Sequence, residues 1–347
     1  MAARAGLSAG ADSRGPAGSP HEATRAALCE ALAPEREVET HAAIVFLTAD
    51  RAFKLKKPVT RSHLDFSTPS RRLWACLSEL RLNRPLAGET YLAVAPVRRA
   101  ASGEIGLEAE GEVIDWVVAM RRLPEDDILE TILKAGERCP PERRDALADR
   151  LVRFFRTAPV MPAGRAARHW SFLFSEARRS RDSLARWEEE LGPDARRLAR
   201  GAVAALAYRR REVMARVAEG IVVEGHGDLR PEHVCLAEPV TIFDRVEFCI
   251  DLRSVDPFDE VAYLGLECEI LGDPDIGPAL VRRLEEAGFA PPSPGLAGLY
   301  RTLRCLTRAR LCMEHLLDPN PRKPEKWAPA ARRYLAHARE ALKAAED

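Results

Sequence analysis

The sequence predicts an α+β fold with two lobes, a small lobe rich in strands followed by a larger helical lobe. Between residues 36 and 120, short runs of β-branched and aromatic residues alternate with polar turns, which is the pattern of strands. Beyond Pro124 the spacing of hydrophobic residues becomes helical and stays so for most of the chain. The 347 residues are 46% hydrophobic and 31% charged, so the chain is long enough to bury a core in each lobe.

Composition excludes several classes of protein. Lys+Arg and Asp+Glu are equal at 53 each, which argues against a nucleic-acid binder that works through positive charge. No hydrophobic run approaches the roughly 18 residues of a membrane span, and the first residues lack the core of a secretory signal. The eight cysteines are scattered singly without zinc spacing, which predicts reduced thiols in a cytoplasmic protein.

The first lobe is expected within residues 23–123, after a disordered tail over residues 1–22. A short helix is expected over 23–33 and three short strands within 36–57. Three more strands are expected over 91–97, 104–109 and 112–120, the last two joined as a hairpin around Glu110 and Gly111.

One longer helix is predicted between these two groups of strands, over residues 67–84. Thr68 can cap its start, and Pro69 suits the first helical position. Leu73, Leu77 and Leu80 would form its hydrophobic stripe, and Pro85 would end it.

The second lobe is expected over residues 124–347. The predicted helices cover 141–157, 170–190, 194–218, 257–270, 278–287, 296–317 and 327–345. They are interrupted by a strand-rich segment over 221–248, in which strands at 233–236 and 240–244 form a hairpin. That hairpin would bring Asp244 beside the loop that holds Asp228, and converging carboxylates suit Mg²⁺.

The residues of this segment resemble those of a known superfamily. His226 to Leu229 read HGDL, and a short hairpin then ends in Phe243-Asp244. This pattern resembles the protein-kinase-like superfamily, in particular the aminoglycoside phosphotransferases, and implies a two-lobed protein-kinase-like fold. The resemblance implies that Asp228 is the catalytic base and Asp244 the Mg²⁺ ligand under the phosphates of ATP. It also implies that Asp256 and Glu260 brace the catalytic loop from behind.

The likeness is closer to a bacterial group of aminoglycoside-phosphotransferase-like proteins. The matching segments are 40–47, 53–59, 64–68, 79–84, 226–229 and 243–248, and the resemblance covers about residues 23–320. Many members of that group carry a second half with a P-loop ATPase, whereas no GxxxxGK[ST] motif occurs here.

In the small lobe the resemblance implies a nucleotide site. Lys54 fits the A-x-K pattern of the phosphate-binding lysine, with Lys56 as the alternative, and Glu79 would position it. Adenine would bind the backbone of a hinge formed by Met120, Arg121, Arg122 and Leu123.

Three positions depart from the family pattern. His233 replaces the Asn that supplies the second Mg²⁺ ligand, so Mn²⁺ would suit the site better than Mg²⁺. Glu232 precedes it and, as a strand neighbour, would point to the opposite side. The turn at 41–43 lacks glycine, which predicts a weaker phosphate clamp, and Glu260 replaces an Asp.

The predicted function is ATP-dependent transfer of a phosphoryl group to the hydroxyl of a small molecule. The alternative is a pseudokinase, which binds nucleotide for regulation without turnover, and His233 is its main support. A third hypothesis is an interaction protein with a relict cleft. The charge of the acceptor substrate is not predicted, because the two regions argue for opposite signs. Residues 141–220 hold 18 arginines against 11 acidic residues, whereas residues 221–290 hold 5 arginines against 16 acidic residues.

Overall fold

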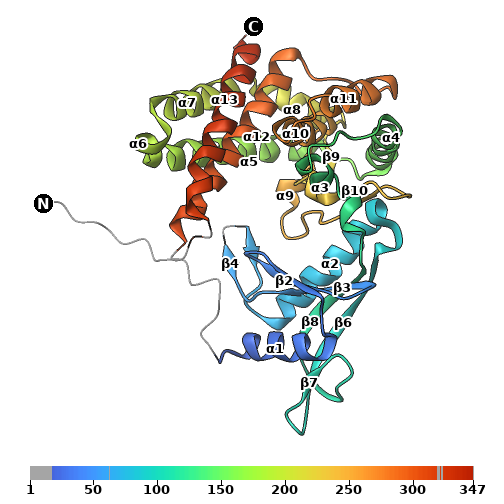
Figure 1. Cartoon of the computed structure of the whole chain (residues 1–347). Helices are drawn as coiled ribbons and strands as arrows, with labels where there is room; N and C mark the ends of the chain where they lie inside the picture. Colours follow the sequence, from blue (N-terminus) through green and yellow to red (C-terminus); the bar gives the residue numbers. More distant parts are fainter. Residues whose placement is uncertain (1–17, 62, 319–320, 322, 347) are drawn as a thin grey trace, which may run out of the picture.

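The computed structural model describes residues 18–61, 63–318, 321 and 323–346. A small lobe built on one sheet lies against a larger helical lobe (Figure 1). The chain enters the small lobe through helix α1 (Pro20–Leu32), which begins three residues before the predicted start at 23. Residues 20–22 are therefore helical, whereas residues 1–17 of the expected tail lie outside the described residues.

One six-stranded antiparallel sheet forms the framework of the small lobe, in the order β1-β2-β3-β8-β6-β7. The strands are β1 (Arg36–Glu39), β2 (Ala43–Leu47), β3 (Arg51–Lys56), β6 (Tyr91–Ala100), β7 (Ile105–Gly106) and β8 (Gly111–Arg121), with a small hairpin of β4 (Thr60–Arg61) and β5 (Leu64–Asp65) beside it. The predicted pairing of the last two strands is wrong. Both edges of β8 are taken by β3 and β6, so β7 pairs with the outer edge of β6 instead.

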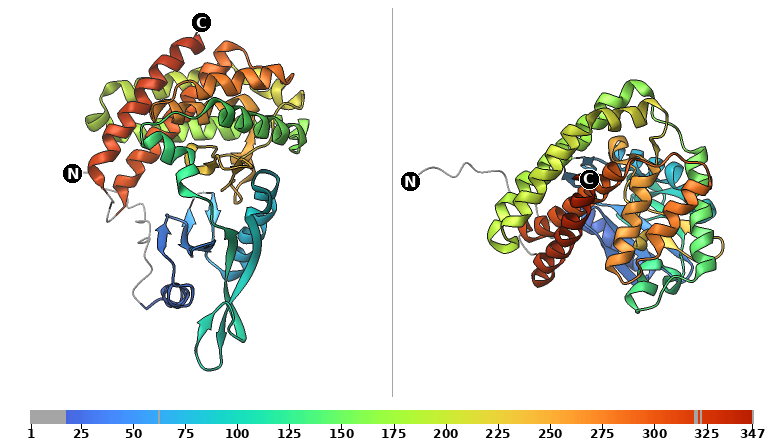
Figure 2. Two further views of the ribbon diagram at one scale, coloured as in Figure 1. Left: turned by 45° about the vertical axis from the view of Figure 1, so that its right-hand side comes forward. Right: turned by 90° about the horizontal axis from the view of Figure 1, so that it is seen from above.

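Two helices cover opposite faces of this sheet. Leu28 of α1 packs with Phe46, Leu55 and Val117 on one face. Helix α2 (Pro69–Ala87) covers the other face, where it packs against Ala52, Val118 and Met120 of the strands. The outer ends of β6 and β8, with β7, point away from the helical lobe (Figures 1 and 2).

Helix α2 is rotated relative to the prediction. Thr68 caps it as expected, accepting a bond from the Arg71 N–H at 3.3 Å. Leu77 of the predicted stripe is 45% exposed, whereas Arg72 and Glu79 are buried. The helix turns this polar face inward because Arg72 pairs with Asp115 of β8 at 2.7 and 2.9 Å and Glu79 pairs with lysines of β3.

Pro85 does not end α2, which continues to Ala87. Proline removes one donor from the helical ladder but leaves the carbonyls of the last turn free. The Arg150 guanidinium takes up two of them, donating to the Pro85 and Leu86 carbonyls at 3.0 and 2.9 Å. A tertiary contact from the other lobe therefore stabilises the last turn.

The larger lobe consists mostly of helices. They are α3 (Leu129–Lys134), α4 (Pro141–Thr157), α5 (Ala166–Leu184), α6 (Glu188–Leu191), α7 (Pro193–Tyr208), α8 (Arg210–Ala218), α9 (Ile250–Arg253), α10 (Pro257–Ile270), α11 (Ile276–Glu286), α12 (Pro294–Glu314) and α13 (Trp327–Glu346). Two pairs of short strands complete the lobe: β10 (Val234–Cys235) with β11 (Thr241–Ile242), and β9 (Val223–Glu224) with β12 (Ser254–Val255). The predicted hairpin of residues 233–244 is confirmed.

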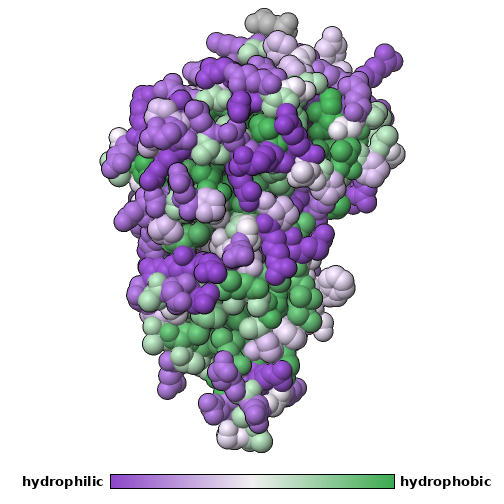
Figure 3. Space-filling view, turned by 90° about the vertical axis from the view of Figure 1, so that its right-hand side faces the viewer, coloured by the Kyte–Doolittle hydropathy of each residue, from purple (hydrophilic) through white to green (hydrophobic). Residues whose placement is uncertain are grey.

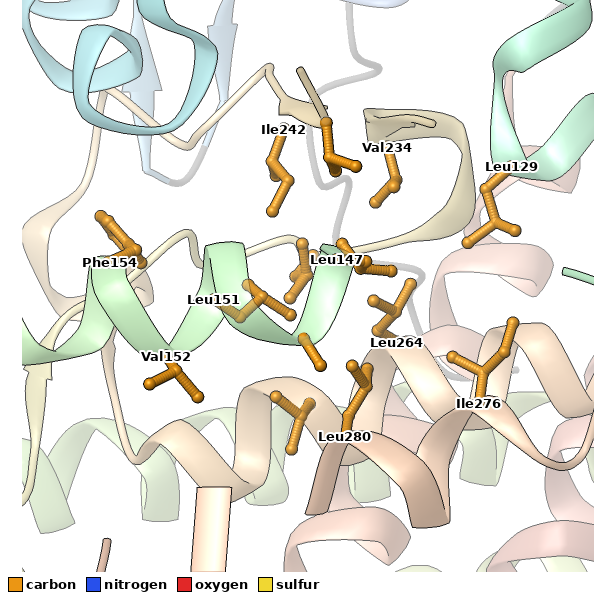
Figure 4. Close-up of a cluster of buried hydrophobic side chains, with 14 of the residues drawn as sticks. Leu129, Leu147, Leu151, Val152, Phe154, Val234, Ile242, Leu264, Ile276 and Leu280 are labelled. Carbon is orange, nitrogen blue, oxygen red and sulfur yellow. The ribbon is translucent and has the colours of Figure 1, made fainter. Parts of the chain in front are cut away.

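The core of this lobe supports that hairpin directly. Leu147 and Leu151 of α4 point toward Val234 and Ile242, with Leu264 of α10 on their other side (Figure 4). The hairpin that follows Asp228 is thus anchored on a packed hydrophobic layer. On the face shown in Figure 3, hydrophobic residues gather over the small lobe and hydrophilic residues dominate the helical lobe. In the described part of the chain, no helix combines the length and the hydrophobicity of a membrane span.

Candidate active site

A chain of charged side chains joins the two lobes at Lys54. The Lys54 Nζ lies 2.8 Å from Glu79 Oε1 of α2 and 2.6 Å from Asp244 Oδ1, which follows β11. Burial alone would lower the pKa of Lys54, but the charges of Asp244 and Glu79 raise it well above its ordinary value. Lys54 is therefore a fixed cation between the lobes, with 14% of its side chain exposed.

Lys56 also binds Glu79, but from inside the protein. Its Nζ lies 2.6 Å from Glu79 Oε2 and pairs with Glu247, and only 1% of its side chain is exposed. It sits 4.9 Å from the centre of the Phe66 ring. The geometry thus separates the two lysines: Lys54 faces the interlobe space, whereas Lys56 is a buried structural cation.

Asp244 has an unusual backbone for a non-glycine residue, with φ at 60°. Its N–H donates to the Tyr91 hydroxyl at 3.1 Å, which fixes it against the small lobe. About 40% of its side chain is exposed, so the second carboxylate oxygen remains accessible. Burial would raise the pKa of Asp244, but the charge of the Lys54 ammonium holds it well below its usual range.

The loop before Asp228 is braced by Glu260 of α10. The two oxygens of Glu260 accept the His226 and Gly227 N–H groups at 2.7 and 2.5 Å. A Cβ on Gly225 would lie 2.5 Å from Glu260 Oε2 and 2.2 Å from Val255, so only glycine fits there. Burial raises the pKa of Glu260 to about 7. The brace implied for the acidic residue at this position is present, although a Glu replaces the Asp.

His226 is a buried neutral histidine within this loop. Its Nε2 donates to the Phe243 carbonyl at 2.8 Å, and its Nδ1 accepts the Asp228 N–H at 3.3 Å. Burial lowers its pKa to about 3, so the ring carries no charge at neutral pH. His226 thereby ties the Asp228 loop to the residue before Asp244.

Arg230 holds the Asp228 carboxylate. The Arg230 Nε and Nη2 lie 3.0 Å from the two Asp228 oxygens, and the Tyr263 hydroxyl donates to Oδ1 at 3.2 Å. Burial would raise the pKa of Asp228, but the charge of Arg230 keeps it well below its usual range. Asp228 is therefore ionised and accepts hydrogen bonds, and the ionised state is the one that a proton acceptor requires.

His233 lies between the two aspartates. Its Nδ1 is 2.8 Å from the Asp228 carbonyl, and its Nε2 is 3.6 Å from Asp244 Oδ2. A carbonyl only accepts, so Nδ1 carries the hydrogen, and in the neutral ring the Nε2 lone pair faces Asp244. This arrangement, with Nδ1 held by a carbonyl, is the one found in metal-binding histidines.

Pro231–His233 form a 3₁₀ turn, so the expected strand does not begin at His233. The prediction that Glu232 points away as its strand neighbour therefore rested on the wrong local structure. Glu232 instead pairs with Arg230 Nη1 at 2.7 Å. The carboxylate of Asp244 and the ring of His233 lie side by side, with Oδ2 and Nε2 3.6 Å apart. No group of three or more His, Cys, Asp or Glu is arranged as a metal site among the residues described.

The segment expected as a hinge follows β8. Met120 is buried against Ala52 and Tyr91, and Arg121 pairs with Arg51 in the sheet. The Arg122 N–H donates to the Asp50 carbonyl at 3.0 Å, so it is already used. Within the described part of the chain, the Leu123 N–H makes no hydrogen bond and is available to a ligand.

The turn that replaces a glycine-rich loop is closed by its own side chain. Thr40 Oγ1 accepts the N–H groups of Ala42 and Ala43 at 3.3 and 3.0 Å. These two N–H groups are therefore already satisfied within the turn.

Several residues around the site carried no assigned role in the sequence. Arg245 is buried, with 3% of it exposed. Its backbone N–H donates to Asn83 Oδ1 at 2.9 Å, and its guanidinium donates to the Leu82 and Gly225 carbonyls at 3.0 and 2.5 Å. It therefore ties the residue after Asp244 to both α2 and the loop before Asp228. Arg245 and Glu247 stand in the segment 243–248 that carried the family resemblance, and that charged pattern was the available signal.

No protein-family model matches the chain. Two mycobacterial proteins, both described as uncharacterized and from Mycobacterium tuberculosis and Mycobacterium bovis, are 32% identical over 310 residues. The match covers 86% of this chain but 58% of each mycobacterial protein, so the chain spans less than two thirds of their length.

A solved structure of a choline/ethanolamine kinase family protein from Mesorhizobium loti shares the fold. It is 14% identical, with a TM-score of 0.52 over 94% of this chain and 98% of that one. The chain therefore shares the two-lobed kinase-like fold of that structure. The fold class predicted from the sequence is confirmed.

Proposed function

We propose that the protein is an ATP-dependent phosphotransferase that acts on the hydroxyl of a small molecule. The observation that carries this proposal is the ion-pair chain from Glu79 through Lys54 to Asp244, with Asp228 held in the adjacent loop. Phosphoryl transfer depends on positioning and charge neutralisation, and these residues supply both. We also propose that the boundary between the two lobes lies between residues 123 and 124.

In this proposal ATP lies between the lobes. Lys54 would bind the phosphates, because it is the lysine open to the interlobe space. The free Leu123 N–H would bind adenine, beside the hydrophobic residues that surround Met120. The eight cysteines, all free thiols, fit the reducing cytoplasm in which ATP is available.

Asp244 and His233 would hold the divalent cation that accompanies ATP. The cation would neutralise charge on the phosphates, and phosphate oxygens and water would complete its ligands. A carboxylate and an imidazole suit Mn²⁺ better than Mg²⁺, which prefers oxygen.

Asp228 would accept the proton of the acceptor hydroxyl. Its ionised state fits a proton acceptor. Both of its oxygens are bound to Arg230, however, so Arg230 must release at least one of them before the hydroxyl can approach.

A second candidate function is nucleotide binding without turnover. The Arg230–Asp228 pair is the specific observation in its favour, because a permanently bound Asp228 could not accept a proton. Measuring ADP release at saturating ATP separates the two functions.

The test of the nucleotide site is the binding of ATP by calorimetry with Mg²⁺ and with Mn²⁺. Lys54→Met should reduce affinity by about 10-fold or more, because one charge-assisted contact to phosphate is lost. Lys134→Met removes a lysine that is 58% exposed and pairs with Glu130 on the same helix, and it should bind as the wild type does. Equal affinities for both variants would contradict the proposal.

His233→Asn tests the metal assignment. Asn supplies an amide oxygen, so the variant should bind ATP more tightly with Mg²⁺ and lose the preference for Mn²⁺. If neither the affinity nor the metal preference changes, His233 only supports the Asp228 loop.

A further inference from the structure

The side of Asp228 that faces the helices is built from charged and polar residues of three segments. Arg230 belongs to the catalytic loop, Tyr263 and Glu267 to α10, and Arg308 to α12. Arg308 lies close enough to Asp228 for its charge to lower the pKa of that carboxyl. If the proposed function holds, the acceptor has to approach Asp228 among these side chains.

The acidic groups of this cluster are already matched. Asp228 and Glu232 both pair with Arg230. Glu267 accepts Arg308 Nε at 3.1 Å and the Tyr334 hydroxyl at 2.9 Å. A cationic acceptor would therefore have to break an existing ion pair to find a carboxylate.

Arg308 still offers donors. Its Nε is used by Glu267 and Tyr334, but neither Nη atom has a hydrogen-bond partner among the described residues. About 21% of its side chain is exposed. The two Nη groups of a guanidinium form a planar fork that matches a phosphate or carboxylate.

Before Asp228 can accept a proton, Arg230 has to exchange the Asp228 carboxylate for another anionic partner. An anionic group that binds Arg230 would replace the Asp228 carboxylate and leave the guanidinium neutralised. The freed Asp228 oxygen would then lie next to the same ligand molecule. Neither a neutral nor a cationic molecule would drive this exchange.

We propose that the acceptor carries a phosphate or carboxylate group, which Arg308 and Arg230 bind beside Asp228. This inference rests on the proposed function. The acceptor oxygen would form a bond to the γ-phosphorus of ATP as the bond from that phosphorus to the β–γ bridging oxygen breaks. The hydroxyl proton passes to Asp228, and ADP leaves.

The direct test is the binding of inorganic phosphate to the full-length chain saturated with ADP and Mn²⁺, which fill the nucleotide site. We expect binding that Arg308→Gln weakens by about 10-fold or more, the loss of one charge-assisted pair. Arg301→Gln is the matched control, because Arg301 lies on the same helix and pairs with Glu269 at 2.5 Å. Equal phosphate affinity in these two variants, or no binding by the wild type, would overturn the proposal.

Two further variants guard against loss of folding. Arg308→Lys keeps the charge but not the fork, so its phosphate affinity should lie between wild type and Arg308→Gln. Arg230→Gln should weaken phosphate binding without involving Glu267. If Arg308→Gln does not fold, the result with Arg230→Gln decides, and unchanged phosphate affinity there overturns the proposal.

Competition against bound phosphate identifies the anionic group. Glycerol 3-phosphate, glycerate, glycerol and 3-amino-1,2-propanediol share a hydroxylated core and differ in charge. Displacement by either anion supports the proposal, and the stronger one identifies the group. Displacement by the amine alone, or by none of the four, contradicts it. ATP affinity, measured separately, reports on the proposed function, so the two can fail independently.

Discussion

Glu79→Gln tests whether the ion-pair chain stabilises the junction of the lobes. Glu79 is fully buried and receives Lys54 and Lys56 at 2.8 and 2.6 Å. Removing one member of a buried ionic group costs about 3–5 kcal/mol. Lys54 retains Asp244 and Lys56 retains Glu247, so we expect the lower value, about 3 kcal/mol.

The assay is thermal unfolding followed by circular dichroism. The entropy of unfolding scales with chain length, so a loss of about 3 kcal/mol lowers the melting temperature by about 4 °C in a chain of 347 residues. The same substitution at Glu89 is the control, because that side chain is 92% exposed and lies 3.8 Å from Arg121. We expect Glu89→Gln to melt as the wild type does.

The same variants separate stability from binding. Glu79→Gln should also weaken ATP binding, because Lys54 would lose one of the two carboxylates that hold it. A melting temperature for Glu79→Gln equal to that of Glu89→Gln would refute the argument that the chain of ion pairs stabilises this junction.

Three further outcomes are expected. Leu151→Ala removes a buried side chain beneath the hairpin that follows Asp228 and should cost about 2–5 kcal/mol of unfolding free energy, measured by urea denaturation. Lys56→Met should lower the melting temperature more than Lys54→Met but change ATP affinity less, because Lys56 is buried away from the interlobe space. Because burial raises the pKa of Glu260 to about 7, folding favours its protonated form, so its contribution to stability declines as pH rises from about 4.5 to above 7. Denaturation between pH 5 and 8 should show a steeper decline for wild type than for Glu260→Gln, and parallel curves would contradict the assignment.

The sequence predicted the parts of the structure that depend on local pattern. Strand alternation around Lys54 and the spacing of Asp228 and Asp244 are properties of short segments, so the hairpin after the catalytic loop could be predicted. The rotation of α2 could not, because its buried face carries Arg72 and Glu79, whose partners lie far away in the chain. Hydrophobic periodicity selects the wrong face of a helix that buries ion pairs.

Long-range contacts also explain the other differences. Pro85 remains helical because Arg150, from the other lobe, binds the carbonyls of the last turn. The role of Arg230 was invisible in the sequence, since an arginine two residues after an aspartate is usually solvated. Only the geometry shows that it holds both oxygens of Asp228.

The most direct test of the proposed activity compares wild type with Asp228→Asn for ATP consumption, measured as ADP release in the presence of Mn²⁺ and a library of hydroxylated metabolites. Asn keeps the shape of Asp228 and its acceptor for Arg230 but cannot take up the proton, so ATP affinity should be unchanged. We predict that at least one metabolite stimulates ADP release by the wild type, and that the variant is slower by about 10²–10⁴-fold. Equal stimulated rates for the two proteins would contradict the claim that Asp228 accepts the proton of the acceptor hydroxyl.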